Sequence, residues 1–212
     1  MTIDVWGDVI CPFCYLGKRQ LERALALFSH ADQVRLRHRA FELDSHSRVA
    51  YDVPLVELVA RKYGRSVAEA TVTHERLERE AAAWDMNWNL ATAQPSNTFD
   101  AHRLIALGAS QGVGEATVER LFVAYFVDSE RVSDPEVLAR IGDEIGVRGV
   151  AAMLASDLYV NDVRADEADA LELGIGGVPA VLIDQRFLVN GAQGDAAFLS
   201  ALERAWARRQ VA

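Results

Sequence analysis

Strand-like patterns occur only near the two ends of this 212-residue sequence, and that order restricts the possible folds more than any other feature. At the start, apolar and polar residues alternate over residues 3–7 and 33–43, with a helical segment between the two strands. Towards the end, residues 179–183 and 187–189 form two short apolar runs that are flanked by helical segments. The stretch from about residue 45 to residue 157 has helical periodicity and helix-start signals throughout. The sequence therefore predicts an α/β fold whose two halves are separated by a block of helices.

The only two cysteines, Cys11 and Cys14, lie directly after the first predicted strand, where the first helix begins. A C-x-x-C pair at a strand-to-helix junction is typical of a thiol–disulfide redox site. Such a pair can instead be half of a zinc site, but tetrahedral sites usually need two further Cys or His ligands at suitable spacing. No second cysteine pair exists, and His38 and His46 are badly spaced for this purpose. We therefore predict a redox pair and no metal.

Composition and charge exclude several classes of protein. The net charge of −9 argues against a general nucleic-acid-binding protein, because such proteins neutralise phosphates with basic residues. No stretch approaches the roughly 18 apolar residues of a membrane span, and the N-terminus lacks the pattern of a secretory signal. Residues 174–177 follow a helix and precede a strand, which is the reverse of the order in a dinucleotide-binding loop. These features predict a cytoplasmic protein with no nucleic-acid partner and no membrane partner.

Two polar residues of the helical block could serve either the structure or a site. Asn97 is most simply a helix cap, with Ser96 as the alternative, for a helix that runs through Leu107 and stops at Gly108. His102 lies on that same helix. It fits a histidine satisfied within the core or at the surface as well as one that faces a cleft.

The charged and aromatic residues also allow more than one interpretation. Asp8 and Lys18 flank the cysteines, and we expect both to be solvated surface charges. The periodicity places Trp84 and Trp88 on the stripe of a helix that Ser66 caps. Five aromatic residues are expected to form the core of the helical block, although some could line a cleft over the cysteines: Trp84, Trp88, Phe122, Tyr125 and Phe126.

Four segments carry a resemblance to a known family. They are Asp-Val-Ile-Cys-Pro-Phe-Cys-Tyr-Leu-Gly at 8–17, Asn-Thr-Phe-Asp-Ala-His-Arg-Leu at 97–104, Gly-Ile-Gly-Gly-Val-Pro at 174–179, and Phe-Leu-Val-Asn-Gly-Ala-Gln at 187–193. Through them the chain resembles the DsbA-like thioredoxin superfamily, and specifically its cytoplasmic FrnE-like branch. The resemblance implies a thioredoxin fold with a large all-helical domain inserted between its two halves. The thioredoxin-like domain would comprise residues 1–45 and 158–212, and the helical insertion would comprise residues 46–157.

The resemblance also implies how the cysteines work. Cys11 would attack or be attacked, because the start of a helix stabilises the thiolate, which is the reactive form. Cys14 would be less exposed and would resolve the mixed disulfide, since its spacing lets it reach the Cys11 sulfur within one turn. Val178 and Pro179 would form a cis-proline loop that faces the pair and exposes backbone to an extended substrate segment. Further substrate contacts would come from residues on both sides of the insertion: Pro12, Phe13, Asn97 and His102.

Pro12 and Phe13 bear on the redox potential. Family members that carry a histidine between the cysteines stabilise the thiolate with its imidazole, whereas Pro12 has no N–H and Phe13 has no polar side-chain group. Our hypothesis is that the reduced form is stabilised less here, which would make the chain a weaker oxidant.

We therefore predict a thiol–disulfide oxidoreductase or isomerase that acts on protein or small-molecule disulfides and thiols. It would need no cofactor beyond the Cys11–Cys14 pair, with glutathione left open as a ligand and a homodimer left open as the assembly. The alternative is a glutathione-dependent isomerase or transferase of the hydroxychromene-carboxylate isomerase or kappa type, whose members typically carry serine at the position matching Cys11. A third class is a binding or chaperone module in which the cysteines are incidental.

Overall fold

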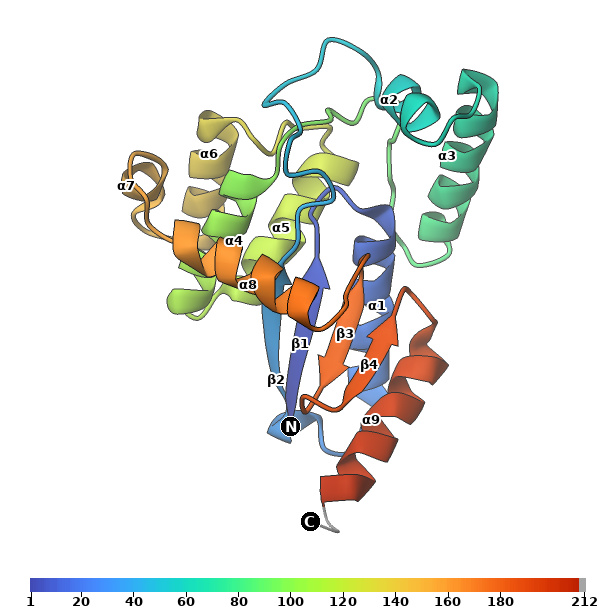
Figure 1. The fold of residues 1–212 in the computed structure, drawn as a ribbon, viewed down its shortest axis with the longest axis vertical. Helices are drawn as coiled ribbons and strands as arrows, with labels where there is room; N and C mark the ends of the chain where they lie inside the picture. Colours follow the sequence, from blue (N-terminus) through green and yellow to red (C-terminus); the bar gives the residue numbers. More distant parts are fainter. Residues whose placement is uncertain (210–212) are drawn as a thin grey trace. The chain divides into compact units, whose positions relative to one another are not determined.

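The computed structural model describes residues 1–209, and these form two compact units (Figure 1). One unit comprises Met1–Leu43 together with the chain from Val163 onward, and the other comprises Asp44–Asp162. The sequence instead placed the divisions after residues 45 and 157, and whether each unit is an independent domain stays a prediction. Within residues 1–209, no helix is both long enough and apolar enough to cross a membrane.

The first unit contains a four-stranded sheet in the order β2-β1-β3-β4. β1 and β2 pair in parallel, whereas β3 pairs antiparallel with both β1 and β4. These strands are β1 (Thr2–Gly7), β2 (Arg35–Ala40), β3 (Ala180–Ile183) and β4 (Phe187–Asn190). The unit also contains α1 (Pro12–Leu27), the short 3-10 helix Ala31–Gln33, most of α8 (Val160–Glu172) and α9 (Asp195–Arg209). This is the predicted α/β arrangement, with β-α-β before the helical block and α-β-β-α after it.

The alternation of side chains along the strands assigns the helices to the two faces of the sheet. Ile3 and Ile183 belong to an apolar cluster with Leu21 of α1 and Phe198 of α9. Trp6 points to the opposite face, where it packs in a second cluster and its indole N–H donates to the Asp166 carbonyl of α8 at 2.9 Å. The sheet is therefore covered on both faces, which is the layering that a thioredoxin fold requires.

Two arginines of β2 pair with a buried carboxylate on the neighbouring strand. Asp4 on β1 is fully buried, and its carboxylate binds the guanidinium groups of Arg37 and Arg39, with the Nε atoms 2.8 and 2.9 Å from Oδ1. Arg39 also donates to Asp166 on α8 at 2.6 Å. Because a buried carboxylate needs compensating charge and hydrogen bonds, these arginine side chains lie partly buried over the sheet. The strand is also shorter than the predicted 33–43.

The second unit consists of helices alone among its regular elements. Four of them, α4 to α7, pack around one another, and α2 packs on α3. The bounds are α2 (Leu55–Lys62), α3 (Val67–Ala82), α4 (Phe99–Ser110), α5 (Gly114–Phe126), α6 (Pro135–Ile145) and α7 (Val150–Leu154). The predicted helix start at Ser66 is confirmed, since Ser66 forms a capping box with Glu69. At the start of α6, Asp134 caps the helix ahead of Pro135.

The prediction that Trp84 and Trp88 lie on a helix is wrong. α3 ends at Ala82, and Asp85 adopts a left-handed backbone conformation with φ of 59°, so the helix cannot continue. Trp88 is nevertheless buried, and its ring stacks on Phe126 with centroids 4.7 Å apart. The expected core role is confirmed for four aromatic residues, whereas Trp84 is only half-buried: Trp88, Phe122, Tyr125 and Phe126.

The prediction that Gly108 stops a helix is also wrong. α4 continues to Ser110, and Gly108 lies at its contact with α5. A Cβ atom at this position would overlap the hydroxyl oxygen of Thr117 and lie 3.1 Å from its Cβ. Gly108 is therefore present because the two helices approach closely, and its cost to helix propensity is offset by packing.

We expect Gly108→Val to destabilise the protein by roughly 2–3 kcal/mol, because the added side chain overpacks the contact with Thr117. Urea unfolding would measure the change as a lower midpoint. Adding Thr117→Ala should recover part of the loss, since it removes the opposing hydroxyl. An unchanged midpoint in the single variant would show that α4 and α5 do not pack as closely as described.

Candidate active site

The two cysteines occupy the first turn of α1. The chain leaves β1 at Gly7 and turns, with the Cys11 amide donating to the Asp8 carbonyl at 3.0 Å. Cys11 is the N-cap residue, with extended backbone angles, and Pro12 follows at the first helical position. The amides of Cys14 and Tyr15 then donate to the Cys11 carbonyl at 3.0 and 3.3 Å. The short connection from β1 into α1 therefore fixes Cys11 at the helix N-terminus, where the first N–H groups have no partner within the helix.

Both cysteines are free thiols and lie 3.2 Å apart. A disulfide requires about 2.05 Å between the sulfur atoms, so closing the bond needs a movement of only ~1 Å. Both residues are buried, with Cys11 3% and Cys14 5% exposed. The expectation that Cys14 is the less exposed of the two is therefore wrong.

The residues before β3 lie against the cysteines. Ala180 pairs with Trp6, so the chain that enters β3 lies beside the chain that leaves β1. The Val178–Pro179 peptide bond is cis, and the Cys11 thiol donates to the Val178 carbonyl at 3.7 Å. This sulfur-to-carbonyl contact joins positions 167 residues apart in the sequence.

Gly17 allows α1 to approach Pro179. A Cβ atom at Gly17 would lie 3.0 Å from Pro179 Cγ and 3.7 Å from Ala192 Cβ. Sequence reasoning gave Gly17 no role. Its position one turn after Cys14 places it on the same side of α1 as that cysteine, which is the signal that could have identified it.

Asp8 is buried beneath the site, contrary to the expectation of a solvated charge. It is 1% exposed, and its Oδ2 accepts a hydrogen bond from the Leu43 amide at 2.8 Å. Leu43 comes just after the parallel strand β2, so the contact depends on strand pairing and not on local sequence. Lys18 also differs from the expectation, because its side chain is only 9% exposed and forms an ion pair with Glu22.

The environment of Cys14 disfavours its thiolate. Burial raises the pKa of the Cys14 thiol well above its ordinary value, and the hydrogen bond and charge of Cys11 raise the pKa further. The charge of Asp8 acts in the same direction, whereas a hydrogen bond from the Asp8 backbone opposes the shift. Cys14 is therefore a neutral thiol at physiological pH, and it must lose a proton before it can act as a nucleophile.

Alkylation of Cys14 in a Cys11→Ser variant should be slow at neutral pH. The rate should rise about tenfold for each pH unit from 7 to 9, because the pKa lies above that range and only the thiolate reacts. Burial, the largest cause of the shift, persists in this variant. Iodoacetamide labelling followed by mass spectrometry would measure the rates. A plateau below pH 8 would contradict the raised pKa.

Comparison with known proteins identifies the family. The DSBA-like thioredoxin domain family matches residues 2–203 of the chain. The chain belongs to this family. A solved structure supports this assignment. The probable DsbA oxidoreductase from Streptomyces coelicolor is 36% identical in sequence to this chain, and its crystal structure gives a TM-score of 0.93 over 98% of this chain and 90% of that protein.

Two more distant structures share the thioredoxin-like DsbA fold. One is 2-hydroxychromene-2-carboxylate isomerase, with 15% identity and a TM-score of 0.69 over 99% of this chain and 98% of that protein. The other is the cytosolic disulfide reductase DsbM from Pseudomonas aeruginosa, with 18% identity and a TM-score of 0.64 over the full length of both chains. DsbM has also been solved with GSH. At these identities the likeness extends to the fold alone.

The predicted substrate-binding residues of this DSBA-like chain divide between the two units. Pro12 and Phe13 lie between the cysteines, and Phe13 is 44% exposed. Asn97 and His102 belong to the helical unit, so their place in the site stays a prediction. Asn97 does act near a helix start, since its Oδ1 accepts from the Phe99 amide at 2.9 Å, although Thr98 is the N-cap residue. His102 is buried, at 3% exposure.

Within residues 1–209, no three His, Cys, Asp or Glu side chains are grouped so that they could hold a metal ion. The site as described brings together two adjacent thiols, one cis-proline loop and one buried carboxylate.

Proposed function

We propose that this protein is a thiol–disulfide oxidoreductase that exchanges disulfides through Cys11 and Cys14. The observation that carries the proposal is the pair of free thiols 3.2 Å apart at the start of α1, with the Cys11 sulfur against the Val178 carbonyl. Membership of the DSBA-like thioredoxin family supports the same chemistry.

In the proposed reaction, the Cys11 thiolate attacks one sulfur of a substrate disulfide. A bond forms between Cys11 and that sulfur, the substrate S–S bond breaks, and the other substrate sulfur leaves as a thiolate that takes up a proton. Cys14 then loses its proton and attacks the Cys11 sulfur, which forms the Cys11–Cys14 disulfide and releases the second substrate thiol. The protein dithiol is oxidised by two electrons and the substrate disulfide is reduced by two. The reverse sequence oxidises a substrate dithiol.

Because the pKa of Cys14 is raised, Cys14 stays neutral during the first step, whereas the second step needs its thiolate. A neutral Cys14 attacks the mixed disulfide slowly, so that intermediate can form and persist until Cys14 loses its proton. The departing substrate thiolate is a base close to Cys14 at that moment, and it is the proposed acceptor of the Cys14 proton.

The proposed substrates are protein or small-molecule disulfides and thiols, including glutathione. The Val178 backbone next to Cys11 would pair with an extended peptide segment, and the exposed Phe13 ring would contact apolar substrate groups. Pro12, Pro179, Asn97 and His102 complete the proposed set of substrate contacts. The DsbM structure with GSH supports glutathione as a ligand to test.

We place this activity in the cytoplasm, as for a FrnE-like branch member, where a reducing environment favours reduction or isomerisation. Pro12 and Phe13 supply no group that stabilises the Cys11 thiolate, so the pair should be a weaker oxidant than periplasmic DsbA. The similarity to the cytosolic DsbM supports this placement.

Equilibration with mixtures of reduced and oxidised glutathione tests the proposal. Alkylating the free thiols at each glutathione ratio and measuring the protein mass by mass spectrometry would give the fraction of Cys11–Cys14 disulfide. We expect one two-electron transition at a potential more reducing than the roughly −120 mV of DsbA, where about 30 mV corresponds to a factor of ten. A transition at the DsbA potential would contradict the weaker oxidant, and no disulfide at any ratio would contradict the redox function.

The second candidate is a glutathione-dependent isomerase, favoured by the fold similarity to 2-hydroxychromene-2-carboxylate isomerase over nearly the whole chain. In that case glutathione would bind beside Val178 and the thiols would not cycle. Activity of a Cys11→Ser variant separates the two candidates.

A further inference from the structure

A hollow of about 400 Å³ lies at the end of the sheet opposite the cysteines. Its lining comes from Thr2 at the start of β1, from Arg37 of β2, from the turn between β3 and β4, and from the end of α9. Cys11 follows the other end of β1, and six residues of strand separate the two ends by roughly 17 Å. The hollow is therefore distinct from the candidate active site.

The turn that forms one wall is held firmly in place. Asp184 and Gln185 both adopt left-handed backbone angles, with φ of 48° and 55°, and the Arg186 amide donates to the Ile183 carbonyl at 3.1 Å. Asp184 Oδ1 accepts from the Thr2 amide at 2.8 Å, and the Gln185 side chain donates to the buried Asp4 at 2.8 Å. These contacts fix the direction in which the turn presents its side chains.

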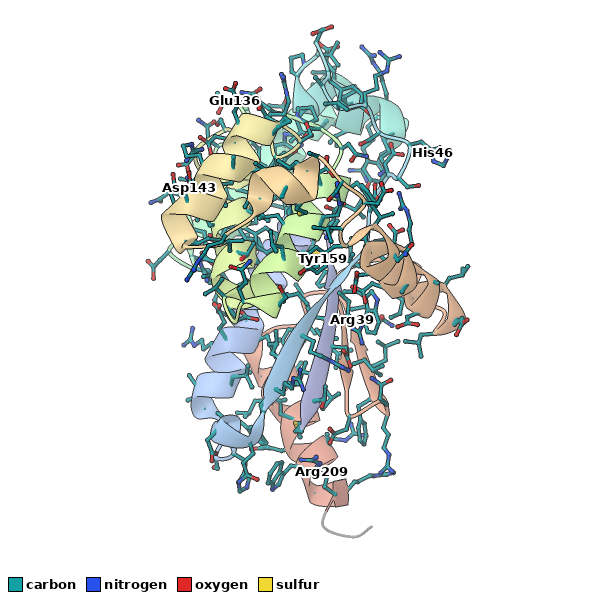
Figure 2. All side chains as sticks on the ribbon, turned by 90° about the vertical axis from the view of Figure 1, so that its left-hand side faces the viewer. Arg39, His46, Glu136, Asp143, Tyr159 and Arg209 are labelled. Carbon is teal, nitrogen blue, oxygen red and sulfur yellow. The ribbon has the colours of Figure 1, made fainter. Side chains whose placement is uncertain are left out.

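The lining of the hollow carries an excess of positive charge. Four of its residues are arginines and one is an acid, although the chain as a whole has a net charge of −9. Arg209, labelled in Figure 2 at the end of α9, has its Nε 2.9 Å from Asp184 Oδ2. Arg37, which also lines the hollow, binds the Asp4 carboxylate through Nε and Nη2. Among residues 1–209, Asp4 and Asp184 offset two of the four arginines, which leaves two positive charges.

Those two charges belong to Arg186 and Arg208. Within residues 1–209, neither side chain has an ion pair or a hydrogen bond to a carboxylate, and both are exposed. The Arg208 guanidinium carbon lies 5.8 Å from the centroid of the Phe187 ring, which also lines the hollow. This contact orients Arg208 at the hollow by a cation–π interaction, and it leaves the guanidinium N–H groups available to a ligand.

We propose that this hollow binds a small, multiply charged anion of the phosphate class. Guanidinium groups match phosphate oxygens with paired N–H donors, and several of them converge here around a volume suited to a small ligand. Arg186 and Arg208 would contact the anion directly, while Arg37 and Arg209 raise the local potential.

Titration of the full chain with inorganic pyrophosphate, followed by amide chemical shifts in NMR, tests the proposal. Sodium chloride at matched ionic strength serves as the reference. We expect saturable shifts centred on residues 184–187 and 205–209, with no comparable shifts at Cys11 and Cys14. Shifts confined to the cysteines, or no saturation beyond that seen with chloride, would overturn the proposal.

A matched pair of variants on α9 identifies the residues responsible. Arg208→Gln and Arg204→Gln remove the same charge from exposed positions of the same helix, but only Arg208 lines the hollow. We expect Arg208→Gln, and likewise Arg186→Gln, to weaken pyrophosphate binding about tenfold, because each removes charge-assisted hydrogen bonds. Arg204→Gln should change the affinity less than twofold. Equal weakening by Arg204→Gln and Arg208→Gln would mean that net charge, and not this hollow, attracts the anion.

Discussion

The Cys11→Ser variant is expected to lose disulfide-exchange activity by at least about 100-fold, because a serine hydroxyl does not ionise near neutral pH and cannot replace the thiolate. The remaining cysteine cannot compensate. Cys14 is buried and its raised pKa keeps it protonated. Reduction of a dye-labelled peptide disulfide, with dithiothreitol or glutathione as the electron source, would measure the rate.

Thermal unfolding of the same variant provides the control, since serine is close in size to cysteine and the midpoint should change little. Two results would count against the redox proposal. Exchange activity that survives Cys11→Ser would show that Cys11 is not the nucleophile. Glutathione-dependent isomerisation of an aromatic substrate, unchanged in the variant, would favour the isomerase.

Asp4→Ala is expected to destabilise the protein by roughly 3 kcal/mol. Asp4 is fully buried on β1, and its carboxylate binds Arg37 and Arg39 of β2 and Gln185 of the turn beyond β3. Removing one partner of a buried ion pair leaves the others without compensation. The two arginine side chains are 38% and 25% exposed and can regain some hydration, so the expected loss is at the lower end of the range for such pairs. Denaturant unfolding would measure it.

Asp4→Asn provides a matched control, because the amide keeps the size and one hydrogen-bond acceptor but removes the charge. We expect a smaller loss than for alanine, on the order of 1–2 kcal/mol. If the Asp4→Ala and Asp4→Asn variants were both as stable as the wild-type protein, the buried carboxylate would not stabilise the sheet as described.

Several parts of the fold were predictable because they depend on neighbouring residues. The strand of residues 2–7, the helix after Cys11 and the caps at Ser66 and Asp134 are set by local alternation, periodicity and side-chain hydrogen bonds. The placement of Cys11 at the start of α1 follows from the same local signals. These are the features that made a redox pair the first hypothesis.

Other features depend on residues far apart in the sequence, and sequence reasoning missed them. The buried Asp4 is paired with arginines of β2, and the buried Asp8 accepts a hydrogen bond from the Leu43 amide, which follows that strand. Gly108 is required by Thr117 on another helix. The sequence around a charged residue looks the same whether the side chain is exposed to solvent or pairs with a buried partner. Only the three-dimensional pairing of strands distinguishes the two cases.

The most direct test of the account is to trap the intermediate between the two proposed steps. Cys14→Ser protein would be mixed with oxidised glutathione, quenched with acid and analysed by mass spectrometry of its peptides. The account predicts one glutathione attached by a disulfide to Cys11, removable with dithiothreitol, and no attachment in the Cys11→Ser variant. A Cys14→Ser protein that acquires no glutathione, or acquires it at a residue other than Cys11, would contradict the central claim.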